Sequence, residues 1–159
     1  MISRMIRVVG VACLVMLGCN GQVAKAGSIT AWGNNEFGQV SNTPAGNDFT
    51  AIAGGSGNGF ALRSDGSIVA WGNDLYGQVS NAPTGTGFTA IAGGLWTNGF
   101  ALRSDGSIAA WGDDRDGQVS NTPAGTGFIA IANGYRTAYA LRSDGSIAAW
   151  GYDYEGQVS

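Results

Sequence analysis

Acidic side chains are the residues of this sequence whose types and spacing could do chemistry. Positions 113–117 read Asp-Asp-Arg-Asp-Gly, a composition that superficially suits a calcium loop. The run lacks the alternating ligands and the distal Glu of an EF-hand, and it does not recur elsewhere in the chain. Two carboxylates could also act as acid and base in glycoside hydrolysis, but nothing in the sequence sets their separation. We therefore expect no metal and no cofactor, and a carboxylate-based hydrolase is only a minor hypothesis.

Histidine, a frequent catalytic base and metal ligand, is absent from the 159 residues. Its absence excludes a Ser-His pair, an imidazole base and a His-bearing metal site. Asp65, Asp105 and Asp144 recur at equivalent places, each two residues after an arginine and directly before a glycine. Turn chemistry explains an aspartate in Ser-Asp-Gly-Ser, and an exposed pair with arginine contributes only about 0 to 1 kcal/mol. The recurrent aspartates are interpreted as structural, and the protein is not expected to be an enzyme.

The elements that would position these side chains belong to a tandem repeat. Trp32, Trp71, Trp111 and Trp150 are 39, 40 and 39 residues apart, each within a copy of SIxAWG that is followed by GQVS. Two further blocks, FTAIAGG and GFALRSDG, recur with small changes at the same period. The repeat domain covers 28–159, divided into 28–66, 67–106, 107–145 and a partial 146–159.

Each block has the length and the glycine-rich borders of a strand of four to six residues. In the first complete unit the four strands are expected to begin at Phe49, Phe60, Ile68 and Gln78. Asp-Gly at 65–66 predicts a tight two-residue hairpin turn, which would place Phe60 opposite Trp71. Both faces of these strands are apolar, so each sheet must be covered on both sides.

Four-stranded units of this length that need cover on both faces predict radially stacked blades. The expected fold class is all-β, a partial β-propeller of about three blades built from tandem 39–40 residue repeats. Complete units lie at 49–80, 88–120 and 128–159, and a leading half unit lies at 28–41. Because propellers usually need about four to eight blades, we expect a homo-oligomer, or a part of a longer chain.

The order AIAGG, then ALRSDG, then AWG resembles the regulator of chromosome condensation repeat family. The short period is most similar to that of the propeller-type β-lactamase inhibitor proteins of bacteria. The resemblance covers essentially all of 28–159 and implies a propeller. It implies no particular activity, because nucleotide-exchange factors and inhibitors share this architecture.

The first 26 residues have the layout of a secretory signal peptide. Arg4 and Arg7 precede an apolar run at 8–17, and small residues follow it. The run is well short of the roughly 20 residues that a membrane-spanning helix needs. Cleavage after Ala26 would release a secreted or periplasmic protein, whereas a lipobox ending at Cys19 would anchor the protein to the cell envelope through lipid. We expect export in either case.

The charge of the exported part excludes one class of partner. From Gly27 onward the chain has five arginines and eleven acidic residues, a net charge of −6. Nucleic-acid binding needs the opposite sign, because lysine and arginine supply the affinity for phosphate. No nucleic-acid partner is expected.

Sequence variation between the repeats is confined to two kinds of loop. The loops between the first and second strands and between the third and fourth strands differ from copy to copy, whereas the other two kinds are nearly constant. In an up-and-down meander both variable kinds emerge at one end of the blades, and their aromatic residues suit a binding surface there. The candidate partner-binding residues are Phe37, Asn58, Tyr76, Leu95, Trp96, Tyr135, Arg136, Tyr152 and Tyr154.

These observations predict an exported, non-catalytic module that binds a protein partner through its variable loops. Seven acidic residues against two arginines give those loops a net charge of −5, which favours a basic or neutral partner. One alternative is lectin-like glycan binding, because aromatic rings beside Asn and Asp also suit sugars. Another is a truncated or self-assembling propeller fragment without a ligand of its own.

Overall fold

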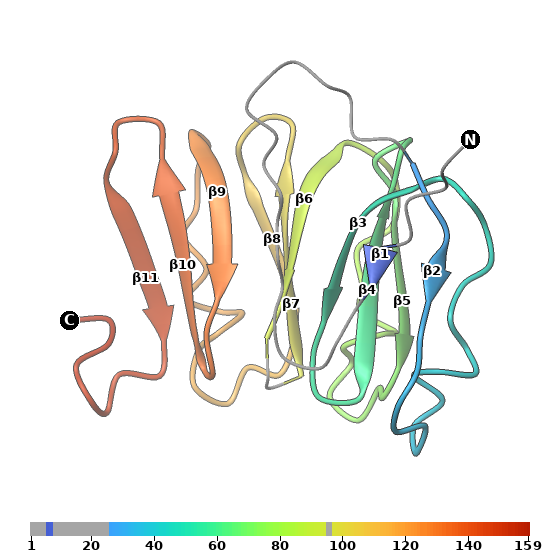
Figure 1. Cartoon of the computed structure of the whole chain (residues 1–159). Coiled ribbons are helices and arrows are strands. Elements are labelled where there is room, and N and C mark those ends of the chain that lie inside the picture. Colours follow the sequence, from blue (N-terminus) through green and yellow to red (C-terminus); the bar gives the residue numbers. More distant parts are fainter. Residues whose placement is uncertain (1–5, 8–25, 95–96) are drawn as a thin grey trace.

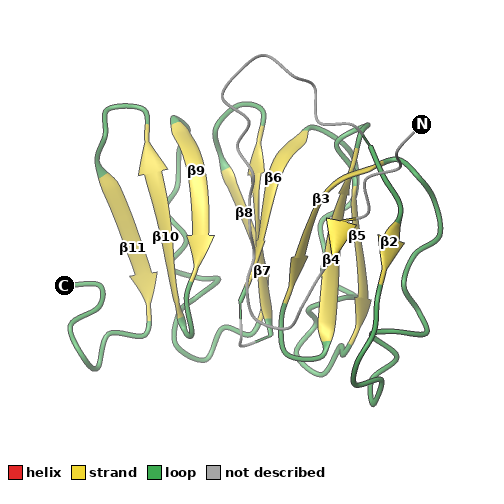
Figure 2. Ribbon diagram, viewed as in Figure 1, coloured by secondary structure: helices red, strands yellow, loops and turns green. Residues whose placement is uncertain are grey.

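The structure, a computed structural model, describes residues 6–7, 26–94 and 97–159, which form strands joined by turns and loops (Figures 1 and 2). Three antiparallel sheets of three strands stand side by side in chain order. Nowhere in these residues is there a helix long and apolar enough to cross a membrane. Sheet 1 contains β3 (Phe49–Gly54), β4 (Asn58–Arg63) and β5 (Ile68–Gly72), sheet 2 contains β6 (Phe88–Gly93), β7 (Asn98–Arg103) and β8 (Ile108–Gly112), and sheet 3 contains β9 (Phe128–Asn133), β10 (Thr137–Arg142) and β11 (Ile147–Gly151).

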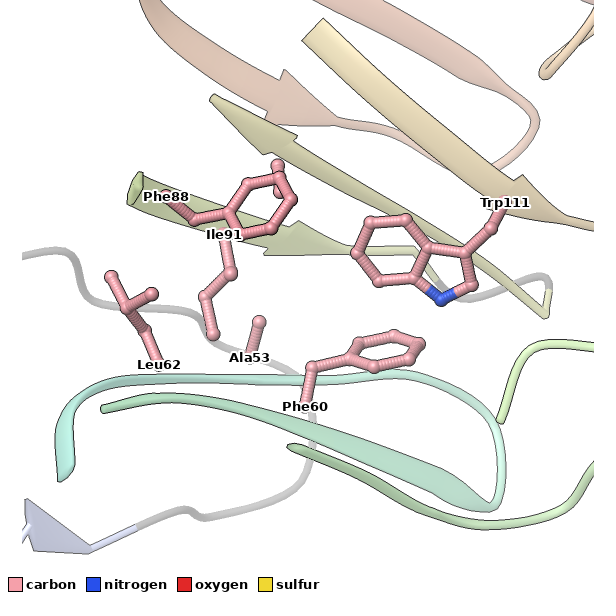
Figure 3. Packing of buried hydrophobic residues seen from close by; sticks show 7 residues of the cluster. Ala53, Phe60, Leu62, Phe88, Ile91 and Trp111 are labelled. Carbon is pink, nitrogen blue, oxygen red and sulfur yellow. The ribbon is translucent and has the colours of Figure 1, made fainter. Parts of the chain in front are cut away.

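The hydrophobic core lies between the sheets, because both faces of each middle strand are apolar. Sheet 1 contributes Phe60 and Leu62 to the first layer, and sheet 2 meets them with Phe88, Ile91 and Trp111 (Figure 3). The same pattern fills the space between sheets 2 and 3. This face-to-face stacking confirms the expected all-β partial propeller with about three blades.

A tryptophan of sheet 2 and one of sheet 3 each contact the repeat before their own. The Trp111 indole N–H donates to the Gln78 carbonyl at 3.0 Å, and the Trp111 ring meets the Phe60 ring edge to face at a centroid distance of 5.3 Å. A ring pair in this orientation contributes about 0.5 to 1.5 kcal/mol beyond its burial. Trp150 makes the equivalent contacts with the Gln118 carbonyl at 2.8 Å and the Phe100 ring at 5.5 Å.

The expectation of a fourth strand from Gln78 is wrong, because that segment forms turns. The Asp74 carboxylate accepts hydrogen bonds from the amides of Val79 and Ser80, both at 2.8 Å. The amide of Asn81 donates to the Gly77 carbonyl at 3.0 Å. These local bonds occupy the amides that a strand would offer to a neighbour, so each sheet ends after three strands.

The expected hairpin register is also wrong, by one residue. Phe60 pairs with Ala70 instead of Trp71. The amide of Gly66 donates to the Arg63 carbonyl at 3.0 Å, and Gly66 has φ of +79°. These features define a three-residue loop with glycine in the left-handed region, instead of the two-residue turn assumed from Asp-Gly. Trp71 therefore lies opposite a glycine, which leaves room for the indole.

The leading half unit covers the open face of sheet 1. β2 (Ile29–Thr30) places Ile29 in a cluster with Phe49 and Trp71, and the amide of Gly27 donates to the Phe49 carbonyl at 2.8 Å. β2 also pairs in parallel with β1 (Ile6–Arg7). Most of the signal peptide, with Cys19, lies outside the described residues, so the expected signal stays a prediction.

The constant hairpins allow a matched test of the packing between sheets. Gly106 and Gly145 occupy equivalent turns with φ of +80° and +87°, but an added Cβ at Gly106 would lie 2.7 Å from the Gly127 nitrogen, whereas Gly145 has nothing within 4 Å. We expect Gly145→Ala to lower the free energy of unfolding by about 1 to 2 kcal/mol for the backbone alone. Gly106→Ala should lower the free energy of unfolding by a further amount of about 1 to 3 kcal/mol, because the added methyl group would crowd the Gly127 backbone. Urea unfolding of both variants measures the difference, and equal losses would contradict this packing.

Candidate functional site

The two kinds of variable loop meet at one end of the sheets, as expected from the order of the strands. We call this surface, formed by 33–39, 55–57, 73–78, 94, 97, 113–118, 134–136 and 152–157, the loop end. Leu95 and Trp96 lie outside the described residues, so their proposed contacts stay a prediction. Backbone hydrogen bonds join the two kinds of loop in each sheet, from Asn73 to Gly57 at 2.8 Å, from Asp113 to Thr97 at 3.0 Å and from Tyr152 to Arg136 at 3.0 Å.

The densest group of candidate residues at the loop end surrounds Arg136. Its guanidinium lies 5.8 Å from the Tyr135 ring centroid and 5.6 Å from that of Tyr152. The Asp116 carboxylate forms an ion pair with it at 3.4 Å. Tyr154 stacks on Tyr152 with centroids 6.2 Å apart and an interplanar angle of 28°. The structure therefore brings four of the candidate binding residues together.

Three different loops build this Arg136 cluster. Arg136 and Tyr135 come from the hairpin between β9 and β10, and the paired tyrosines follow β11. Asp116 comes from the loop after β8 in the preceding sheet. The ion pair therefore crosses from one repeat to the next, and the cluster forms only when sheets 2 and 3 are stacked.

The aromatic rings of the cluster differ from core aromatics in their exposure. Tyr154 is 82% exposed and Tyr135 is 57% exposed, whereas Phe100 in the core is 1% exposed. Arginine stacked on tyrosine is a composition typical of the residues that dominate protein interfaces. The arrangement can bind a partner surface by aromatic contact and hydrogen bonding.

A second cluster links the loops of the first two sheets. Arg115 lies 4.6 Å above the Tyr76 ring and donates to both carboxylate oxygens of Asp113, with the shortest distance 2.6 Å. Asp113 is buried, and its hydrogen bonds from the Arg115 side chain hold the pKa of its carboxyl below the usual value. Thr97 adds a long hydrogen bond of 3.5 Å to the same carboxylate and has a positive φ of 32°. The ion pair therefore joins a buried carboxylate to a half-exposed guanidinium that lies over the Tyr76 ring.

Several acidic residues of the loop end hold their own loops. The Asp114 carboxylate accepts bonds from the amides of Val119 and Ser120 at 2.8 Å, as Asp74 does one repeat earlier. The bonded Ser80 amide is the main cause that lowers the pKa of Asp74. Sequence comparison counted these side chains only as surface charge. The signal that could have revealed their role is an Asn or Asp at the same place in every copy.

The remaining candidate residues have different surroundings. Phe37 is 47% exposed and lies over Gly57 of the next sheet, where no side chain intervenes. Asn58 was expected on an exposed loop, but it begins β4 and is only 5% exposed. Neither its side-chain oxygen nor its nitrogen has a hydrogen-bond partner. Asn58 therefore does not present its amide on the surface, because the strand begins two residues earlier than expected.

At the opposite, constant end of the sheets, the polar side chains form hydrogen bonds within the turns. Asp65 accepts hydrogen bonds from the Ser67 hydroxyl at 2.7 Å and from the Ser67 amide at 2.8 Å, and the hydroxyl is the main cause that lowers the pKa of Asp65. Arg63 is held by both oxygens of Asp48, at 2.7 and 2.9 Å. An open hollow of about 400 Å³ lies beside these residues. Within the described ranges no three His, Cys, Asp or Glu side chains gather closely enough to hold a metal ion.

The buried Asp113 carboxylate generates a pH prediction. Because its folded-state pKa is lowered, its ionised form stabilises the fold above about pH 4, and this stabilisation is lost as the pH falls through the lowered value. We expect Asp113→Asn to cost about 1 to 2 kcal/mol at pH 7. The difference from the wild-type protein should shrink towards pH 2. Urea unfolding at both pH values measures it, and a difference independent of pH would contradict the role of this ion pair.

Comparisons with known proteins agree with the repeat and the fold. Residues 49–78 match the family model of the Regulator of chromosome condensation (RCC1) repeat. No curated protein sequence matches the chain. The CRINKLY WD40 ectodomain of the Arabidopsis thaliana receptor kinase ACR4 is 20% identical, with a TM-score of 0.63 over 86% of this chain and 47% of that one.

Two further solved structures give the same result. Yeast RCC1 (Prp20) bound to Kap60 is 21% identical, with a TM-score of 0.62 over 79% of this chain and 40% of that one. The ectodomain of the Physcomitrella patens receptor kinase CR4 is 23% identical, with a TM-score of 0.59 over 76% of this chain and 34% of that one. The chain thus spans less than half the length of these structures, and at this identity they show the fold, a part of a β-propeller.

Proposed function

We propose that this chain, which carries the RCC1 repeat in a stack of propeller sheets, is a non-catalytic module that binds a protein partner through its loop end. The observation that carries the proposal is the Arg136 cluster. Tyr135 and Tyr154 keep most of their surface in solvent and are the most exposed aromatic side chains among the described residues. Exposed rings held by fixed neighbours lose little conformational freedom on binding, which favours affinity.

The charge of the loop end favours a basic partner. Arg115 and Arg136 are each paired with an aspartate of the same surface, at 2.6 and 3.4 Å. The remaining acidic side chains leave the loop end with a net charge of −5. Such a field steers a positively charged protein towards the loops and accelerates association at low salt.

Structures of similar fold support a protein as the partner. Yeast RCC1 (Prp20) is bound to Kap60 in one of them, and another concerns the binding properties of Prp20p to Gsp1p and histones. The two plant proteins are ectodomains of receptor kinases. We propose that the partner of this chain has a basic or neutral protein surface with grooves that accept tyrosine rings.

Glycan binding is a second candidate for the same surface. It is favoured by the stacked pair Tyr152 and Tyr154, because the Tyr154 ring is 82% exposed and its neighbour in the chain is the acidic residue Asp153. Flat aromatic faces beside polar groups suit sugar rings as well as proteins. A carboxylate-based hydrolase is not favoured by any contact at the loop end.

The binding proposal predicts a loss that is confined to one end of the sheets. A variant with Tyr135→Ala, Tyr152→Ala and Tyr154→Ala should bind a captured partner at least about 30-fold more weakly, as expected when interface aromatics are removed. The matched control replaces the exposed serines of the constant end by Ser64→Ala, Ser104→Ala and Ser143→Ala and should bind like the wild-type protein.

The measurement has three arms. The immobilised chain captures proteins from the envelope and culture medium of its source, and titration of the purified partner gives the affinity of each variant at low and high salt. A set of immobilised glycans tests the sugar candidate, and a class A β-lactamase tests the inhibitor-like expectation. Equal affinity of the tyrosine variant and the wild-type protein would show that the partner binds elsewhere.

Export of the module is part of the same proposal. The arginines and the apolar run of the first 26 residues support it. We expect the mature protein to begin at Gly27 or at a lipid-modified Cys19. The intact mass of the exported protein distinguishes the two. Recovery of the uncleaved chain from the cytoplasm would contradict export.

A further inference from the structure

Trp32 differs from its equivalents in the later repeats. Trp71, Trp111 and Trp150 are 7%, 3% and 4% exposed, whereas Trp32 is 48% exposed. All four lie in the same SIxAWG block, Trp32 directly after Ala31 beyond the short β2 and the other three within β5, β8 and β11. The exposure of Trp32 therefore follows from its position at the start of the row of sheets.

The later tryptophans pack against the repeat that precedes each of them. Their indole N–H groups donate to the carbonyls of Gln39, Gln78 and Gln118 at 2.8 to 3.0 Å. In two cases the indole also meets a phenylalanine of the preceding middle strand edge to face. The same contact therefore recurs between successive repeats, with the tryptophan of one repeat packed on the outer face of the repeat before it.

The opposite end of the row has the matching face without its tryptophan. Sheet 3 lies at the far end from β2 (Figure 1). Ile147 there is 69% exposed, whereas its equivalents Ile68 and Ile108 pack against the cores between sheets. Ala132 is exposed, although the alanine at its position in sheet 1, Ala53, is 2% exposed.

The partners that a tryptophan would need are present on this face. Tyr139 occupies the position of Phe60 and Phe100, the rings that receive Trp111 and Trp150. Gln157 occupies the position of the glutamines whose carbonyls accept the indole N–H. The two ends of the chain therefore carry the two halves of one contact.

We propose that the Trp32 end of one copy docks on the outer face of sheet 3 of a second copy, so that the chains associate head to tail. Trp32 packs against the ring of Tyr139 and donates its indole N–H to the Gln157 carbonyl, and Ile147 is covered. A second copy is the occupant that fits, because this sequence already makes the same contact between its own repeats. Such an interface joins two different surfaces and leaves a further Trp32 end and a further sheet 3 face to continue the association.

The experiment measures the mass of the purified chain in solution as a function of concentration, by light scattering and sedimentation. Trp32→Ala removes the indole, and Ile147→Asp places a charge on the receiving face. We expect each variant to weaken self-association at least tenfold. The control Leu75→Ala removes an apolar side chain that is 74% exposed at the loop end and should associate like the wild-type protein.

Mixing the two variants distinguishes this interface from a symmetric one. The Trp32→Ala protein keeps an intact sheet 3 face, and the Ile147→Asp protein keeps an intact Trp32 end, so their equimolar mixture should form a dimer with a single interface. A mixture that stays monomeric would overturn the proposal. So would a monomeric wild-type protein at every concentration, or self-association of Trp32→Ala alone, which would indicate pairing of two sheet 3 faces.

Discussion

The contact of a tryptophan with the preceding repeat is the interaction on which the rest of this structure depends. A three-stranded sheet with two apolar faces is unstable alone, because each face needs cover. The Trp111 indole covers the ring of Phe60 and satisfies the Gln78 carbonyl, so burial and hydrogen bonding come from one side chain. Because each repeat touches only its neighbours, stability is expected to accumulate sheet by sheet along the chain.

Because the sheets are stacked, a residue in one loop contacts a loop of the next repeat, so a substitution there affects both loops. The position before Gly-Gln contacts the next sheet in the first three copies. Phe37 lies over Gly57, and Asp116 pairs with Arg136. Tyr76 lies beneath Arg115. A change at this position therefore alters two loops, and the surface that results belongs to a pair of repeats instead of one.

The charges of the loop end divide into two physical classes. Asp74 and Asp114 accept backbone amides of their own loops, and Asp113 is buried against Arg115. These side chains maintain loop shape, and they also contribute to the negative field. Tyr135 and Tyr154 near Arg136 are 57% and 82% exposed, which is why the proposed function assigns the partner contact to them. In the proposed function, loop shape and partner contact therefore depend on different side chains of the same surface.

The sequence by itself determined the repeat period, the two-faced strands and the end at which the variable loops emerge. These follow from local patterns, since the alternation of side chains and the order of strands depend only on the chain. Tertiary structure decided the hairpin register and the loss of the fourth strand. Gly66 adopts a left-handed conformation in a three-residue loop, and the Asp74 carboxylate occupies the amides that a ladder needs. Competition between local hydrogen bonds and strand pairing depends on three-dimensional geometry, and for the same reason the burial of Asn58 could not be read from its residue type.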